Sequence, residues 1–256
     1  MGRKIITQPE LPKRKFLSPV INQSATKRDV QSFLNKNNTV AKFTLDFFDE
    51  YIKLCDQQNT KFRLDGGLKK YLRRWQYYWT VKNTPVKNGS LILDAGCGGS
   101  LFPFFLSSFY KSDVIGIDVG NEEIKMSENL KKIFPELKVK FIKADMVDFK
   151  YEKKFDAIFS ISVIEHIERW LDALVNLGGL LTGNGFLSFT FDYRKWRNRK
   201  LRGYMFTQEE INIIINELKK HNVLLRGNGF VDRTSLTKHL IKRRYYTAGV
   251  SFFKKS

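Results

Sequence analysis

A glycine-rich turn that follows Asp94 carries the strongest chemical signal in the chain. A short apolar run ends at Asp94, passes through Gly96, Gly98 and Gly99, and leads into the apolar segment 101–109. This order is typical of a strand, a tight turn and the start of a helix. Glycine lets the backbone approach a ligand closely, and a helix start offers free N–H donors. The turn therefore predicts a ligand-binding site.

Acidic and hydroxyl side chains close the apolar runs that come next. Asp118 ends the second run, Asp145 lies just after the third, and the fourth ends in Ser160 and Ser162. The carboxyl ends of parallel strands meet at one edge of a sheet, and ligands bind outside that edge. A carboxylate in the position of Asp118 can accept both hydroxyls of a ribose. The spacing thus predicts a nucleotide-type site along one sheet edge.

Strand and helix patterns alternate through the middle of the chain. This alternation predicts an α/β fold with a doubly wound, mostly parallel sheet. We expect strands at 91–94, 114–118, 138–142, 155–161 and 185–191, and helices at 101–110, 122–134 and 165–177. Helices at 40–54 and 68–81 are expected before this core, with Trp75 and Trp79 packed inside, and a capped helix at 207–220 and a strand at 247–253 after it.

The expected domain organisation has two parts. Residues 1–88 would be a basic N-terminal arm and helical lid, with 1–25 extended because of its three prolines. Residues 89–256 would be the ligand-binding domain, with a basic insertion at about 192–205.

The motifs resemble those of class I S-adenosylmethionine-dependent methyltransferases. Asp94-Ala-Gly-Cys-Gly-Gly-Ser is similar to the first motif of that family, Val-Ile-Gly-Ile-Asp118 to the second, Ala-Asp145-Met to the third, and Val-Ile-Glu165-His166 to the fourth. The similarity covers about residues 88–192, and Ser100 departs from it, because the family has glycine there. The C-terminal tail of the chain has a weaker similarity to the broad ubiquinone-biosynthesis-like group. The family implies a Rossmann-like methyltransferase fold with an antiparallel last strand.

The resemblance also implies a cofactor, S-adenosyl-L-methionine, which leaves as S-adenosyl-L-homocysteine. Asp118 would bind the ribose hydroxyls, Asp145 the adenine amino group, and an arginine of the lid helix, Arg73 or Arg74, the cofactor carboxylate. The implied cofactor residues are Asp94, Ala95, Gly96, Cys97, Gly98, Gly99, Asp118, Val119, Asp145, Met146, Ser160, Ser162 and Arg74.

Two residues after the fourth strand are candidates for a catalytic base. Methyl transfer from a sulfonium mainly needs nucleophile, methyl and sulfur in line, and an oxygen or carbon nucleophile also needs a base. His166 is the first candidate and Glu165 the alternative. The chain has no Cys/His cluster with metal-ligand spacing, so no metal is expected.

The net charge of +19 is unevenly distributed. Basic residues exceed acidic ones by 11 in residues 1–88 and by 11 in 191–256, whereas 89–190 have a net charge of −3. Basic and aromatic side chains alternate after the last core strand, where they would face an acceptor with phosphate or ring groups. The candidate acceptor-binding residues are Tyr193, Arg194, Trp196 and Arg197.

Three functions fit these observations. The first is methyl transfer to a small, anionic acceptor, which the tail favours. The second is RNA methylation through the basic flanks, which the charge favours. The third is a non-catalytic cofactor-binding or scaffold protein, which the intact motifs disfavour. Two cysteines and no long apolar run predict a cytoplasmic protein without a membrane span.

Overall fold

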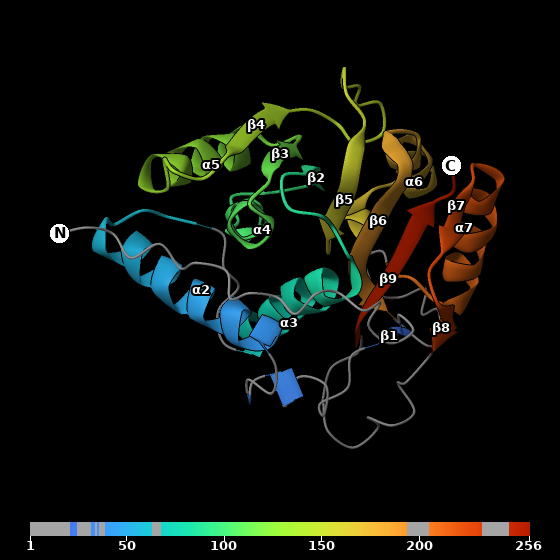
Figure 1. Cartoon of the computed structure of the whole chain (residues 1–256), viewed down its shortest axis with the longest axis horizontal. Coiled ribbons are helices and arrows are strands. Elements are labelled where there is room, and N and C mark those ends of the chain that lie inside the picture. Colours follow the sequence, from blue (N-terminus) through green and yellow to red (C-terminus); the bar gives the residue numbers. More distant parts are fainter. Residues whose placement is uncertain are drawn as a thin grey trace.

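One mixed β-sheet with helices on both faces forms the described part of the protein (Figure 1). The computed structural model describes residues 21–24, 32–33, 35, 39–62, 68–193, 205–231 and 246–256. The strands are β1 (Ile21–Ser24), β2 (Leu91–Ala95), β3 (Asp113–Asp118), β4 (Val139–Lys143), β5 (Phe155–Ile161), β6 (Leu181–Tyr193), β7 (Val223–Leu225), β8 (Asn228–Val231) and β9 (Tyr246–Lys254). The helices are α2 (Thr39–Gln57), α3 (Leu68–Asn83), α4 (Phe102–Tyr110), α5 (Asn121–Ile133), α6 (Trp170–Gly179) and α7 (Gln208–Lys220), with the 3-10 turn η1 (Ile164–His166).

Five strands run parallel in the order β4-β3-β2-β5-β6. The chain builds away from β2 through β3 and β4, and then starts again on the other side of β2 with β5. Ligands bind where such an order reverses, at the carboxyl ends of the strands. β9 lies antiparallel beside β6. The predicted doubly wound, mostly parallel sheet with an antiparallel last strand is therefore confirmed.

Two short strands share the far side of β9, and a third lies beyond one of them. β7 pairs with the C-terminal half of β9, and β1 pairs with its first half through Gln23 and Gly249. β1 also pairs in parallel with β8. The expectation that 1–25 is only an extended arm is wrong for residues 21–24, whose backbone lies inside the sheet. The other residues of that segment lie outside the described residues.

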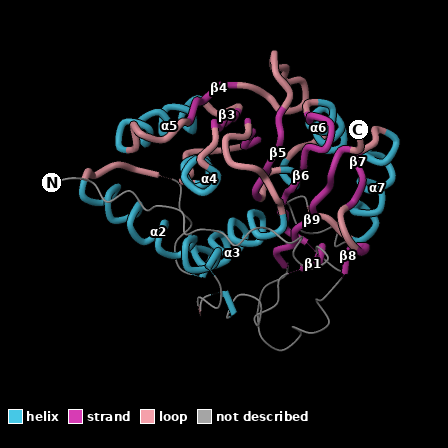
Figure 2. The backbone as a smooth tube through the Cα atoms, in the orientation of Figure 1, coloured by secondary structure: helices cyan, strands magenta, loops and turns pink. Residues whose placement is uncertain are grey.

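Helices lie on both faces of the sheet (Figure 2), and each face has its own core. Helices α2 to α5 cover one face with a largely aromatic core, in which the ring of Phe105 meets Phe47 edge-on and stacks with Tyr77. Helices α6 and α7 cover the other face. Trp75 and Trp79 are buried, which confirms their predicted packing role. Each such buried ring stabilises the fold by about 1.5–3 kcal/mol.

Several element boundaries differ from the prediction. The expected helix 165–177 is interrupted, because η1 ends at His166 and α6 begins at Trp170. The expected strand 185–191 is longer, since β6 begins before the glycines of 183–185, with a register shift at its start. Thr207 and Glu210 form the predicted capping box of α7. No helix in the described ranges is both long and apolar enough to cross a membrane.

Candidate functional site

The glycine turn lies at the carboxyl end of β2 and is fixed to β3. The backbone N–H groups of Gly96 and Cys97 both donate to the carbonyl of Ile117, at 2.8 and 2.9 Å. Gly96 has φ +82°, and a Cβ there would come within 2.5 Å of a methyl of Val163. Only glycine fits this conformation and this close approach. Ser100 Oγ accepts a hydrogen bond from Phe102 N, next to the start of α4.

Asp118 closes β3 and contacts the glycine turn directly. Its Oδ2 accepts from Gly98 N and its Oδ1 from Gly120 N, both at 2.9 Å. The side chain is half-buried, and each carboxylate oxygen keeps a second lone pair. The next residue, Val119, is 61% exposed. An oriented carboxylate beside an exposed apolar side chain fits a ribose that carries a flat base.

Asp145 and Met146 follow β4 on the same edge. Asp145 is exposed, and its Oδ1 accepts from Val147 N at 2.9 Å. Met146 is buried in the core, and its carbonyl accepts from Asn176 Nδ2 at 3.0 Å. Asn176 also binds the carbonyl of Phe149, so α6 fixes this loop. No pattern in the sequence indicated the role of Asn176.

Asp94 and Cys97 are interior residues of the site. Asp94 is 2% exposed, and burial, followed by the charge of Asp118, raises its pKa well above the ordinary value. Burial also raises the pKa of the Cys97 thiol, which packs against Gly116. Ala95 is equally buried. These side chains support the turn from inside, and the turn presents its backbone.

Helix α3 crosses the carboxyl end of β5 and supplies two polar side chains. Arg73 donates to the carbonyl of Ile161 at 3.1 Å, and Gln76 Nε2 donates to Ser162 Oγ at 2.6 Å. Ser162 has φ +51°, an uncommon conformation that is associated with functional sites. Ser160 points into the core, where its Oγ has no hydrogen-bond partner.

The two neighbouring arginines of α3 face different ways. Arg74 pairs with Asp49 at 2.7 Å and lies over the ring of Phe48, so its guanidinium points to α2 and away from the sheet edge. Of the two arginines that the resemblance offers for the cofactor carboxylate, Arg73 lies at the carboxyl end of β5, whereas Arg74, the one included among the implied cofactor residues, does not.

Carboxyl groups are spread along the edge in strand order. Asp118 ends β3, Asp94 ends β2, Glu165 follows β5 and Asp192 lies near the end of β6. Arg73 lies among them, because its charge lowers the pKa of both Asp94 and Glu165. This edge therefore combines several carboxyl groups, two of them buried, with one arginine.

The two candidate bases face opposite ways. Glu165 is fully buried, and its Oε1 accepts from Asp192 N at 3.0 Å. Burial, and then the charge of Asp192, raises the pKa of Glu165 to about 8. His166 is exposed. The sequence alone did not separate these neighbours.

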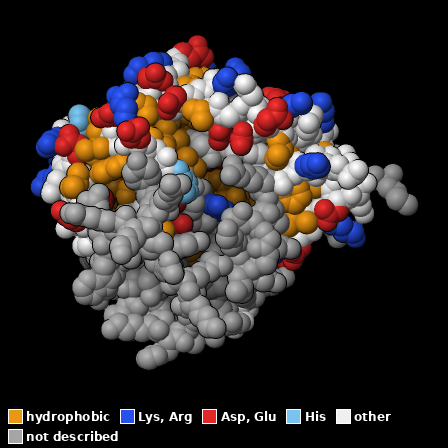
Figure 3. Space-filling model, turned by 180° about the vertical axis from the view of Figure 1, so that it is seen from behind, with side chains coloured by type: hydrophobic (Ala, Val, Ile, Leu, Met, Phe, Trp, Pro, Cys, Tyr) orange, Lys and Arg blue, Asp and Glu red, His pale blue; other side chains and the backbone are white. Residues whose placement is uncertain are grey.

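The predicted acceptor-binding residues are only partly described. Tyr193 is 1% exposed and belongs to the core beneath α7, paired in the sheet with Tyr246. Arg194, Trp196 and Arg197 lie outside the described residues. On the face drawn in Figure 3, basic and acidic side chains are interspersed over the described surface.

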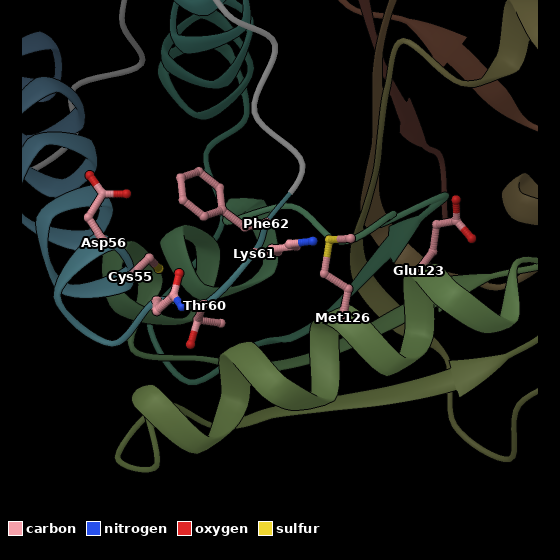
Figure 4. A pocket seen from close by; sticks show the side chains of 8 residues that line it. Cys55, Asp56, Thr60, Lys61, Phe62, Glu123 and Met126 are labelled. Atoms are coloured by element: carbon pink, nitrogen blue, oxygen red, sulfur yellow. The ribbon is translucent and has the colours of Figure 1, made fainter.

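A groove of about 700 Å³ lies between α5 and the segment that follows α2 (Figure 4). Met126 and Glu123 of α5 form one wall, and Lys61 and Phe62 lie opposite. Glu123 lies at the sheet edge, since a Cβ on Gly120 would meet both its carboxylate and that of Asp118. The sequence did not predict this groove, because its walls come from segments far apart in the chain.

Comparison with known proteins defines the class of this site. Residues 93–189 match the model of a methyltransferase domain family. This range contains the glycine turn, Asp118, Asp145 and His166. This part of the chain is therefore similar to a methyltransferase domain.

Three curated relatives are named as methyl- or carboxymethyltransferases of different acceptors. (S)-Coclaurine N-methyltransferase of Papaver somniferum is 28% identical over 108 residues, which is 42% of this chain and 31% of the relative. The tRNA U34 carboxymethyltransferase of Alcanivorax borkumensis is 29% identical over 44% of this chain and 35% of its own. Ubiquinone biosynthesis O-methyltransferase of Pelagibacter ubique is 31% identical over 48% of each. The matches span less than half of each relative.

A solved structure shows the same fold. The [4+2]-cyclase SpnF has a TM-score of 0.61 at 15% identity, over 77% of this chain and 87% of its own. Because the name of that protein is that of a cyclase, the fold alone does not decide the reaction.

Proposed function

We propose that this protein is an S-adenosylmethionine-dependent methyltransferase. The observation that carries the proposal is Asp118, whose carboxylate is oriented by Gly98 and Gly120 beside the exposed Val119. This arrangement fits the ribose and base of the cofactor. When bound, the cofactor supplies a methyl group activated by a sulfonium.

The chain's own residues would hold the cofactor along the carboxyl edge. Asp118 would accept the ribose hydroxyls, and Asp145, which is exposed just after β4, would accept from the adenine amino group. Arg73 would bind the carboxylate. The helical part of residues 1–88 would form the cover of this site.

His166 would act on the acceptor. It is exposed just past the carboxyl end of β5, near the point where the strand order reverses. A neutral imidazole there can take the proton of an oxygen nucleophile. If the His166→Ala variant keeps turnover within a few-fold at all pH values, positioning alone or another base is responsible.

We propose a small-molecule acceptor with an anionic group. The support is the contrast between the net charge of −3 in residues 89–190 and the excess of 11 basic residues in each flank. Four basic residues in 194–199 are suited to a charge-removal test, in which Arg194, Lys195, Arg197 and Arg199 become Ser. The variant should bind S-adenosylhomocysteine normally in calorimetry and show a raised KM for the acceptor. Full activity on the acceptor would remove the support for an anionic group.

RNA is the second candidate acceptor, because the chain has a net charge of +19 and a tRNA-modifying enzyme is among its relatives. The two classes differ in salt dependence, since each neutralised phosphate releases counterions. Turnover of radiolabelled cofactor on a metabolite panel and on total RNA, each at two salt concentrations, separates them. Steep loss of RNA methylation with salt would favour RNA, and a weak dependence with a metabolite the small molecule.

A further inference from the structure

Glu165 and His166 are adjacent in η1 but have opposite environments. Glu165 is fully buried, whereas His166 is exposed. The turn itself is held by two backbone hydrogen bonds, from His166 N to Val163 O at 2.8 Å and from Ile167 N to Ile164 O at 3.2 Å. A side chain that anchors the turn from inside would therefore fix the direction in which His166 projects.

Glu165 extends the hydrogen bonding between β5 and β6 beyond the end of the strand ladder. The last registered pair is Ile161 with Thr190, followed by a bond from Ser162 N to Thr190 O at 2.9 Å. After Ser162 the backbone of the first strand turns away. Glu165 Oε1 then accepts from Asp192 N at 3.0 Å and replaces the missing backbone acceptor.

The same region of β6 is held from a second side. The carbonyl of Asp192 accepts from Phe206 N at 3.0 Å, and Tyr193 forms an isolated bridge with Phe206. The ring of Phe206 packs against Trp170 and Phe191. The bond from Glu165 thus connects η1 to a well-packed part of the core.

The second carboxyl oxygen of Glu165 is not suited to reach an acceptor. Oε2 is buried and has no hydrogen-bond partner. The charged groups that act on this carboxyl are Asp192 of β6, which disfavours its ionised form, and Arg73 of α3, which favours it. A pKa of about 8 keeps it mainly protonated at neutral pH, where a neutral acid costs less to bury than a carboxylate.

We infer that Glu165 is a positioning residue. It joins the carboxyl ends of β5 and β6 from inside the protein and so holds His166 at the carboxyl edge of the sheet. The inference rests on the proposed function for the role of His166, but not for the geometry. It assigns the buried residue a structural link and leaves proton transfer to its exposed neighbour.

Two substitutions separate positioning from catalysis. Glu165→Gln keeps an oxygen that can accept from Asp192 N but cannot act as a base, and Glu165→Met keeps the volume without the acceptor. We expect Glu165→Gln to keep kcat within about 3-fold of the wild type and Glu165→Met to lower kcat about 10- to 100-fold. The affinity for S-adenosylhomocysteine should stay unchanged in both. The matched control is Glu168→Gln on the exposed side of the same segment.

Histidine NMR supplies a readout that does not depend on turnover. The chain has three histidines, so the imidazole signals can be assigned by substitution. The His166 signal should shift in Glu165→Met and stay near its wild-type position in Glu165→Gln, while the His221 signal stays constant in both.

The outcomes are distinct. Loss of turnover in Glu165→Gln with an unchanged His166 signal would overturn the inference and make Glu165 the base. An unchanged His166 signal in Glu165→Met would also overturn it. If the wild type transfers no methyl group, the proposed function fails, and the NMR result alone decides whether Glu165 positions His166.

Discussion

Polar side chains are hydrogen-bonded differently at the two ends of the parallel strands, which we call the amino edge and the carboxyl edge of the sheet. At the amino edge, Asp156 accepts from Leu91 N at 2.9 Å and from Thr182. Lys154 and Lys254 donate to carbonyls at the end of α6. At the carboxyl edge, by contrast, Glu165 leaves one oxygen without a partner.

The contrast shows that energetically unfavourable features are concentrated at the carboxyl edge. Each amino-edge side chain named above has a hydrogen-bond partner, as expected for a structural region. The carboxyl edge combines carboxyl groups of raised pKa, Asp94 and Glu165, with the left-handed Ser162. Strain and shifted pKa values of this kind concentrate at functional sites. Substitutions at the two edges should therefore separate function from stability.

The largest expected effect concerns pH. Glu165 has a folded-state pKa of about 8 against an ordinary 4.5, so the unfolded chain ionises first. The stability that this residue contributes is present below pH 4.5 and is lost as the pH rises toward 8, by roughly 3–5 kcal/mol in total. Glu165→Gln should flatten that part of the pH dependence in urea unfolding, and Glu168→Gln should not. Parallel curves for the wild type and Glu165→Gln would contradict the raised pKa.

Asp118→Ala should have the next largest effect, on the cofactor. It removes a charge-assisted acceptor for two hydroxyls and should weaken S-adenosylhomocysteine binding about 30- to 150-fold, or about 2–3 kcal/mol. Calorimetry measures this directly, and circular dichroism checks the fold. Unchanged affinity in a folded variant would show that the ribose lies elsewhere.

Gly96→Ala should lower the free energy of unfolding by about 2 kcal/mol, from backbone strain and from contact with Val163. Gly89→Ala is the matched control, because Gly89 has φ +76° and open space around it. The control should lose only about 1 kcal/mol. Adding Val163→Ala to Gly96→Ala should remove the steric part. Equal losses for both glycines would mean that the turn is not tightly packed.

The smallest effect is expected at the amino edge. Asp156→Ala leaves Leu91 N without its acceptor and should cost about 1 kcal/mol of stability. Cofactor affinity should not change, which a thermal shift with and without S-adenosylhomocysteine measures. A loss of affinity comparable to that of Asp118→Ala would erase the distinction between the two edges.

Local sequence patterns predicted the parts of the site that follow from strand ends. The glycine turn, Asp118 and Asp145 were recognisable because a parallel sheet brings the ends of its strands to one edge. The capping box of α7 was recognisable from Thr207 and Glu210 alone. In each case a short stretch of sequence contains the whole physical cause.

Side-chain direction was not predictable in the same way. Which of Arg73 and Arg74 faces the sheet depends on how α3 rotates over it, and adjacent residues on a helix point about 100° apart. Glu165 and His166 are adjacent residues of a 3-10 turn and also point in different directions. Which of them faces inward is set by the packing of this turn against β6. The pairing of residues 21–24 with β9 depends on partners at the other end of the chain, which no local pattern encodes.

The pairing of Gln23 with Gly249 has a consequence for the rate of folding. Joining segments so distant in sequence is entropically unfavourable until the intervening chain is already ordered, so this contact should form late. Trp79 of α3 packs on the same Gly249, within 2.6 Å of where a Cβ would lie. The helix that carries Arg73 therefore gains its contact with Gly249 only when β9 is in place. A partly folded intermediate would contain the glycine turn before α3 is fixed beside it.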